Sequence, residues 1–259
     1  MFLTHEQSLP NAPQRIVSLV PSQTELLHYF SLHDEVVGLT KFCIHPTEWF
    51  QIKTRIGGTK TLDIQKIRAL QPDLIIANKE ENIKEQVEML AAEFPVWVTD
   101  VNTVKESLQM IVELGQLTNR LSLALNLVEK IRFEFEAFKN KGLPQIKVAY
   151  LIWNEPMMTV GGDTFINDML LWAGFENVFA NLKRYPEITV DAIRNAGAEW
   201  ILLSSEPYPF KEKHMAALQQ KLPYQKIILL DGEMFSWYGS RMLHAPAYFK
   251  SLRWNYLGK

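Results

Sequence analysis

Residues suited to binding a small molecule follow most of the short apolar runs in this sequence. They are Phe42, His45, Thr59, Lys60, Asn78, Lys79, Glu80 and Glu81 in the first half, and Trp153, Glu155, Trp237, Tyr238 and Arg241 in the second. If the apolar runs are parallel strands, their carboxyl ends meet at one edge of a sheet, and α/β proteins bind ligands at that edge. The sequence therefore predicts a small-molecule site built from these side chains.

Among the aromatic residues of this group, Trp153, Trp237 and Tyr238 offer flat surfaces to a ring-shaped ligand. Trp153, Trp237 and Tyr238 lose little conformational entropy when they pack on such a ligand. Packing inside a hydrophobic core is the alternative role for all three. Trp237 and Tyr238 favour the ligand role, because they stand beside Gly239 among polar residues and outside any apolar run.

The charged residues allow two interpretations. Lys60, Arg241 and the run Lys79-Glu80-Glu81 could contact polar groups of a ligand, or the run could be a solvated loop. A further alternative is catalysis, in which Glu80 or Glu81 forms an acid and base pair with Glu155 across a bound substrate.

No metal centre built by the protein alone is expected, and no cofactor is predicted. His45 could supply an axial or hydrogen-bonding contact to a ligand metal, or it could bond to nearby backbone. The six histidines form no pair at i and i+4, and the single cysteine excludes a cysteine-based zinc cage. Neither phosphate-binding glycine motifs nor a nucleophile elbow occur.

Composition narrows the classes of partner. The 259 residues are 47% hydrophobic and 22% charged, with a formal net charge of −2, as in an ordered globular protein. No dense basic run points to nucleic acid or an anionic membrane, and no apolar run approaches the ~20 residues that span a bilayer. We expect a monomer that binds a small molecule. As written the chain has no export signal and is expected in the cytoplasm, or in the periplasm or at the cell surface if translation starts upstream.

Strands alternate with helices along the whole chain. The apolar runs at 16–20, 35–39, 73–77 and 95–98, and then at 147–153, 200–204 and 226–231, are predicted strands. Capping-box patterns start helices at Ser22 and Thr103, and Asp63 caps a helix that ends before Pro72. This alternation predicts an α/β fold with parallel sheets.

One long helix is predicted near the middle of the chain, over residues 119–140. Its apolar residues recur at spacings of three and four, with no proline or glycine, and it would be roughly 33 Å long. It is either a surface helix of one lobe or a bridge between two lobes, and its position between two βα series favours the bridge. The predicted division is an N-terminal α/β lobe at 1–118, a linking helix at 119–140 and a C-terminal α/β lobe at 141–259.

Three stretches resemble a known family, the helical-backbone solute-binding proteins. They are Arg15-Ile16-Val17-Ser18-Leu19-Val20-Pro21-Ser22, then residues 63–77, and residues 196–203 as the second-lobe parallel. This family comprises receptors of ABC importers for cobalamin, iron-siderophores and haem. The resemblance implies two Rossmann-like parallel-sheet lobes joined by one long backbone helix, with the ligand in the cleft between them.

Within the family the sequence is most similar to cobalamin receptors. Their cleft aromatics would fall at Phe42, Thr59, Asn78 and Tyr185, of which only Phe42 and Tyr185 are aromatic here. The resemblance therefore implies a metal chelate, with a corrinoid first and an iron-siderophore or haem next. A cytoplasmic carrier or sensor of such a chelate is a further alternative.

The resemblance also implies a permease partner. Family members present one acidic residue on each lobe to the permease, and the corresponding positions here are Gln65 and Asp191. One of the two acidic residues of the family is therefore missing from this sequence.

Overall fold

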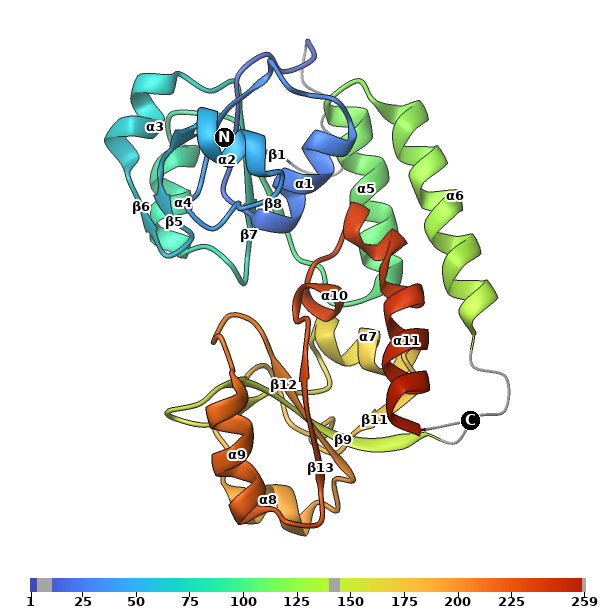
Figure 1. The fold of residues 1–259 in the computed structure, drawn as a ribbon. Helices are drawn as coiled ribbons and strands as arrows, with labels where there is room; N and C mark the ends of the chain where they lie inside the picture. Colours follow the sequence, from blue (N-terminus) through green and yellow to red (C-terminus); the bar gives the residue numbers. More distant parts are fainter. Residues whose placement is uncertain (4–10, 140–144, 258–259) are drawn as a thin grey trace. The chain divides into compact units, whose positions relative to one another are not determined.

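Each of the two compact units of the chain is organised around a β-sheet of mostly parallel strands. The computed structural model describes residues 1–3, 11–139 and 145–257 (Figure 1). Unit 1 comprises Met1–Val101, Lys105–Ile131 and Tyr238–Arg241, and unit 2 comprises Asn102–Val104, Arg132–Trp237 and Met242–Lys259. Neither unit is continuous in sequence, whereas the sequence-based division was 1–118, 119–140 and 141–259.

Unit 1 is built on a sheet of six parallel strands among its described residues, in the order β1-β8-β7-β2-β3-β4. The strands are β1 (Phe2–Leu3), β2 (Ile16–Ser18), β3 (Val36–Leu39), β4 (Thr54–Arg55), β7 (Leu74–Asn78) and β8 (Val96–Thr99), and β5 (Gly57–Gly58) pairs separately with β6 (Thr61–Leu62). β7 is buried at every residue, as expected for a parallel strand covered on both faces. The four predicted strands of this half are confirmed to within two residues at each end.

In the part of the chain that the structure describes, four helices lie between these strands, and a fifth follows β8. They are α1 (Pro21–Tyr29), α2 (Thr47–Ile52), α3 (Ile64–Leu70), α4 (Lys84–Ala91) and α5 (Val104–Leu117). The predicted cap of α3 is confirmed, because the Asp63 carboxylate accepts a hydrogen bond from the Lys66 backbone N–H at 3.1 Å. The predicted cap at Ser22 is wrong: α1 begins at Pro21, and Ser22 is buried inside its first turn. Proline is favoured at the first helical position, and here it set the start of the helix.

Unit 2 has the same organisation. Parallel strands β9 (Ile146–Trp153), β12 (Trp200–Ser204) and β13 (Lys226–Leu230) adjoin in that order, with β11 (Phe175–Asn177) parallel and β10 (Met158–Thr159) antiparallel to β9. The helices are α7 (Phe165–Trp172), α8 (Val190–Asn195), α9 (Glu212–Lys221), α10 (Glu233–Ser236) and α11 (Ala245–Leu257), and a 3-10 helix lies at Ser240–Leu243. All three predicted strands of this half are confirmed.

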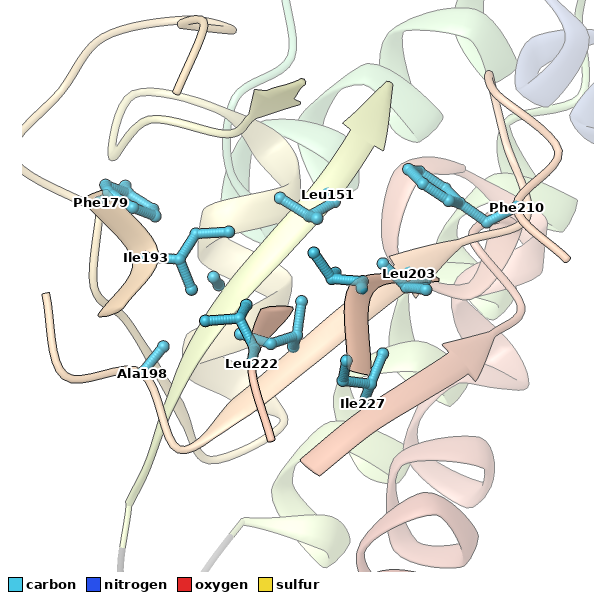
Figure 2. Close-up of a cluster of buried hydrophobic side chains, with 11 residues drawn as sticks. Leu151, Phe179, Ile193, Ala198, Leu203, Phe210, Leu222 and Ile227 are labelled. Atoms are coloured by element: carbon cyan, nitrogen blue, oxygen red, sulfur yellow. The ribbon is translucent and has the colours of Figure 1, made fainter. Parts of the chain in front are cut away.

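An apolar core joins the sheet of unit 2 to helices α8 and α9. Leu151 and Leu203 project from neighbouring strands toward Ile193 and Leu222, and Phe210 lies at one end of the cluster (Figure 2). Leu151 and Leu203 lie near the carboxyl ends of β9 and β12, so the core reaches the strand ends that precede the predicted site residues.

The chain passes from unit 1 to unit 2 within helix α6 (Leu121–Phe138), between Ile131 and Arg132. With 18 residues α6 is about 27 Å long, shorter than the predicted helix. It starts later than predicted because Asn119 has a left-handed backbone with φ 55°, which separates α5 from α6. The predicted end at Asn140 lies outside the described residues.

Candidate functional site

Each sheet has a point where the strand order reverses, and ligands of α/β proteins bind outside such points. In unit 1 the chain leaves β2 toward β3 on one side and later returns to β7 on the other. In unit 2 the corresponding point lies between β9 and β12. The two groups of residues are described separately.

A buried polar network closes the carboxyl ends of β7 and β8 in unit 1. The Asn78 amide nitrogen bonds the Thr99 carbonyl and hydroxyl oxygens, both at 3.1 Å, and Gln23 Nε2 donates to the same hydroxyl at 2.6 Å. Asn78 Oδ1 accepts from the backbone N–H groups of Glu80 and Glu81. Asn78, predicted as a ligand contact, therefore holds the loop that carries the two glutamates.

Glu81 carries an unusual carboxyl group for a strand-end loop. Burial raises its pKa, the ammonium of Lys60 opposes that shift, and the charge of Glu80 adds to it. Burial raises the pKa of the Tyr238 hydroxyl and the Glu81 charge adds to the rise, so the two groups are close enough to interact electrostatically. Four predicted residues, Lys60, Glu80, Glu81 and Tyr238, are thus neighbours within unit 1.

The lysines of this edge are engaged within unit 1. Lys60 donates to the Glu80 carbonyl oxygen at 2.5 Å, and Lys79 forms an exposed ion pair with Asp100 at 2.7 Å. Solvent screens an ion pair of this kind, so it adds little to stability. The exposed Lys79 pair supports the interpretation of this run as a solvated loop. The Lys60 hydrogen bond links the segment of β5 and β6 to the loop after β7.

The segment after β3 places Phe42 at the surface and Cys43 in the interior. Phe42 is 50% exposed, with the Lys41 ammonium 5.1 Å from the centre of its ring. His45 is half-buried, and Thr59 is buried with its carbonyl oxygen bonded by the Asn82 amide at 3.1 Å. Phe42 is therefore an exposed aromatic side chain in the segment after β3, and its predicted ligand contact stays a prediction.

Arg241 is held by a carboxylate of its own unit. Its guanidinium bonds both oxygens of Glu25, at 2.6 and 3.0 Å, and both side chains are largely buried. A bidentate pair of this kind fixes the geometry of the guanidinium. Arg241 anchors the segment Tyr238–Arg241 on α1.

In unit 2, aromatic side chains gather at the carboxyl end of β9 and in the loop after β12. Trp153 is 38% exposed, its indole N–H donates to the Glu155 carbonyl oxygen at 3.1 Å, and its ring centre is 5.5 Å from that of Tyr208. Tyr208 comes from the loop after β12. Nothing in the local sequence distinguishes it as a site residue, and only the pairing of β9 with β12 brings it to Trp153.

Trp237 is buried in unit 2 with its indole N–H bonded to the Glu206 carboxylate at 2.9 Å. Ser236 donates to the same carboxylate oxygen. The burial of Trp237 favours the alternative role, packing in the core, and its indole N–H is bonded to a carboxylate there. Tyr185 is half-buried, and Glu155 is exposed and belongs to a different unit from Glu80 and Glu81.

The two predicted docking residues lie on short helices, one in each unit. Gln65 is exposed in the first turn of α3. Asp191 is exposed in the first turn of α8, where it forms an ion pair with Arg194 of the same helix.

Within the described residues no group of three or more His, Cys, Asp or Glu side chains is arranged to hold a metal ion. Over the same residues, every helix is too short or too polar to cross a bilayer.

Comparisons with known proteins agree on one family. A family model for periplasmic binding proteins matches residues 16–229. A vitamin B12-binding protein of Vibrio vulnificus strain CMCP6 is 26% identical over 198 residues, which cover 74% of this chain and 72% of the relative.

Solved structures show the same fold. The periplasmic vitamin B12 binding protein BtuF of Vibrio cholerae superposes with a TM-score of 0.77 at 20% identity, over 94% of this chain and 99% of that one. The apo form of the periplasmic heme-binding protein RhuT from Roseiflexus sp. RS-1 superposes with a TM-score of 0.78 at 20% identity, over 93% and 99%. With the family model covering most of its length, the chain belongs to the periplasmic binding protein family.

Proposed function

We propose that this protein binds a metal chelate and delivers it to an ABC-type uptake system, with a corrinoid as the leading ligand and haem or an iron-siderophore next. The observation that carries the proposal is the family match over residues 16–229, together with relatives and structural neighbours that are vitamin B12- and haem-binding proteins. No catalytic role is proposed for Glu80, Glu81 or Glu155.

The side chains at both sheet edges support a ligand that is partly apolar and partly polar. Phe42 in unit 1 and Trp153 in unit 2 are exposed aromatic surfaces. Glu80 and Glu81 supply carboxyl oxygens next to a buried amide and hydroxyl network. Binding sites for small molecules commonly combine aromatic walls with a few placed polar groups.

Titration with four probes tests the proposal: cyanocobalamin, dicyanocobinamide, haemin and ferric enterobactin, each followed by absorption spectroscopy and thermal unfolding. We expect one probe to bind and to raise the unfolding midpoint. A ligand at 100 times its Kd stabilises the native state by about 2.7 kcal/mol. Lysozyme of equal concentration controls for nonspecific adsorption of the probes.

If none of the four probes changes its spectrum or shifts the unfolding midpoint, the proposed ligand class is wrong. The variant Phe42→Ala provides a second test, because Phe42 is exposed and its removal leaves the core intact. It should weaken binding of the active probe about tenfold while the unfolding midpoint of the unliganded protein stays unchanged.

Delivery to a permease is part of the same proposal. We therefore also propose a periplasmic location, which is that of the two structural neighbours described above. Asp191 would contribute the acidic contact of unit 2, and Gln65 a neutral contact on unit 1. Asp191→Asn is expected to slow association with the permease and to flatten its dependence on salt, since exposed charges act chiefly on association rates. We propose a monomer as the binding form.

A further inference from the structure

A group of aromatic residues beyond β12 has no role in the sequence-based site. Tyr208 lies in the loop after β12, and its ring centre is 4.8 Å from that of Phe210 and 5.2 Å from that of His214. The Tyr208 backbone N–H donates to the Ile152 carbonyl oxygen at 3.3 Å. The loop therefore lies against the end of β9, directly beside Trp153.

Trp153 and Tyr208 form a corner rather than a stack. Their rings are inclined by 63° with centres 5.5 Å apart. Trp153 is 38% exposed and Tyr208 half-buried, so both retain surface that a ligand can reach. We name this pair the aromatic corner. It lies beyond the carboxyl ends of β9 and β12, where the strand order of unit 2 reverses.

The hydrogen bonds of His214 determine what the Tyr208 hydroxyl can do. The Lys211 backbone N–H can only donate, so His214 Nδ1 accepts its hydrogen bond at 2.9 Å. In the neutral imidazole the proton then sits on Nε2, which is 3.0 Å from the Tyr208 hydroxyl oxygen and donates to it. This arrangement leaves the hydrogen of the Tyr208 hydroxyl to donate elsewhere.

We propose that the aromatic corner is the ligand surface of unit 2, with Trp153 and Tyr208 packing on the ring system of the metal chelate and the Tyr208 hydroxyl donating to a ligand oxygen. His214 is a positioning residue, which acts by orienting that hydroxyl. This inference rests on the proposed function and goes further, because it selects ligands that combine an extended planar ring with a peripheral carbonyl or carboxylate oxygen.

Fluorine NMR on protein labelled with 5-fluorotryptophan tests the contact without any change to the corner. The resonance of Trp153 is assigned from Trp153→Phe, and that of Trp254 from Trp254→Phe. Trp254 is 60% exposed on α11 and serves as the internal control. With dicyanocobinamide or haemin bound, the Trp153 resonance should shift and the Trp254 resonance should not.

Affinity measurements on matched variants test the energetic role. Trp153→Ala and Tyr208→Ala should raise the Kd of the bound probe about tenfold or more, as expected for aromatic anchors. Tyr208→Phe keeps the ring and loses the hydroxyl, so its loss should be smaller, about threefold. His214→Ala should resemble Tyr208→Phe, and the double variant should lose no more than either single one, because both act through one hydroxyl.

Tyr224→Ala is the matched control for tyrosine, because Tyr224 is 96% exposed and lies outside the corner. If the Tyr208→Ala variant does not fold, the Tyr208→Phe variant and the fluorine spectrum of the wild-type corner still test the proposal. The inference is overturned if a probe binds while the Trp153 resonance stays unmoved, or if Tyr208→Phe, Tyr208→Ala and Trp153→Ala all bind like wild type. If no probe binds to the wild-type protein, the proposed function itself is wrong and this inference falls with it.

Discussion

The pKa of the single cysteine, Cys43, is shifted by its surroundings in the fold. Cys43 is fully buried, with its sulfur 3.1 Å from the Thr24 hydroxyl and 3.2 Å from the Thr40 hydroxyl. Burial raises the pKa of the thiol to about 11, although both hydroxyls oppose the shift. The reactive thiolate is therefore scarce at neutral pH.

We predict that native Cys43 reacts slowly with iodoacetamide. At pH 8 a thiol of pKa 11 is ionised about one hundred times less than one of pKa 9, so alkylation should be at least about a hundredfold slower than in urea. Mass spectrometry of timed samples gives the rate, and because the chain has one cysteine the single adduct is unambiguous. Labelling at equal rates in native and unfolded protein would contradict the buried thiol.

The same shift predicts how stability changes at high pH. The unfolded chain loses the Cys43 proton near pH 9 and the native state only near pH 11, so stability falls as pH rises between these values. Cys43→Ala should remove up to about 3 kcal/mol of that fall. Urea unfolding of wild type and variant at pH 8 and pH 11 isolates this contribution from those of the tyrosines.

At the scale of elements, a buried arginine of α11 caps the C-terminal end of a different helix, α7. Arg253 of α11 is 4% exposed and donates to the carbonyl oxygens of Ala173 and Gly174, at 3.1 and 2.7 Å. These carbonyls follow the last turn of α7 and have no partner within that helix. Arg253 thus joins α11 to the end of α7, and the Gly174 carbonyl oxygen also accepts from the Ile146 N–H at 3.4 Å.

Arg253→Met should lower the free energy of unfolding by about 2 kcal/mol, because two buried carbonyl oxygens lose a charged donor while the apolar volume is largely kept. Urea unfolding followed by circular dichroism measures the loss. Lys250→Met on the same helix is the control, since Lys250 is exposed. Equal stability of the two variants would show that solvent replaces the arginine.

Gly162 and Gly197 are each needed for a different reason, one for close packing and the other for backbone conformation. A Cβ atom at Gly162 would lie 2.1 Å from the Ala180 carbonyl oxygen, where residues 158–162 run beside residues 182–188. Gly197 follows α8 with φ +71°, and no atom lies within 4 Å of its position for a Cβ. The first glycine is required by a neighbouring backbone and the second by its own conformation.

We predict that Gly162→Ala costs about 3 kcal/mol or more, since the obstacle is backbone and cannot move aside. Gly197→Ala should cost only about 1 kcal/mol, the strain of a left-handed alanine. Thermal unfolding of the two variants tests the ranking, and a reversed order would contradict the packing described for residues 158–162.

At the scale of the whole molecule, the last part of the chain completes the first unit. Residues Tyr238–Arg241 belong to unit 1, where the Gly239 N–H donates to the Ser107 hydroxyl at 3.2 Å and Arg241 pairs with Glu25. Arg241 and Glu25 are 216 residues apart in sequence. Unit 1 is therefore incomplete until the chain has passed through most of unit 2.

A double-mutant cycle on Glu25→Gln and Arg241→Met should give a coupling energy of about 2 kcal/mol, because the pair is bidentate and largely buried. The same cycle on Asp191→Asn and Arg194→Met should give less than about 0.5 kcal/mol, because that pair is exposed. Similar couplings for both pairs would show that Tyr238–Arg241 is not anchored through Glu25.

The sequence by itself determined the elements and their class. Apolar runs such as 74–78 and 200–204 are buried at every residue, so local composition suffices to predict parallel strands and the two α/β units. It also indicated that the strand ends carry the polar and aromatic side chains. Helix limits were less accurate, because Pro21 and the left-handed Asn119 decided them rather than the apolar period.

Only the tertiary structure decided which of those side chains are engaged by other parts of the protein and which remain exposed. Trp237 and Arg241 have the residue types of ligand contacts, yet Glu206 and Glu25, distant in sequence, engage them. Tyr208 carries no local signal and reaches Trp153 because β12 pairs with β9. The position of a strand can be predicted from the pattern of consecutive residues. The contacts of a side chain depend instead on which strands pair, and the local sequence does not specify that pairing.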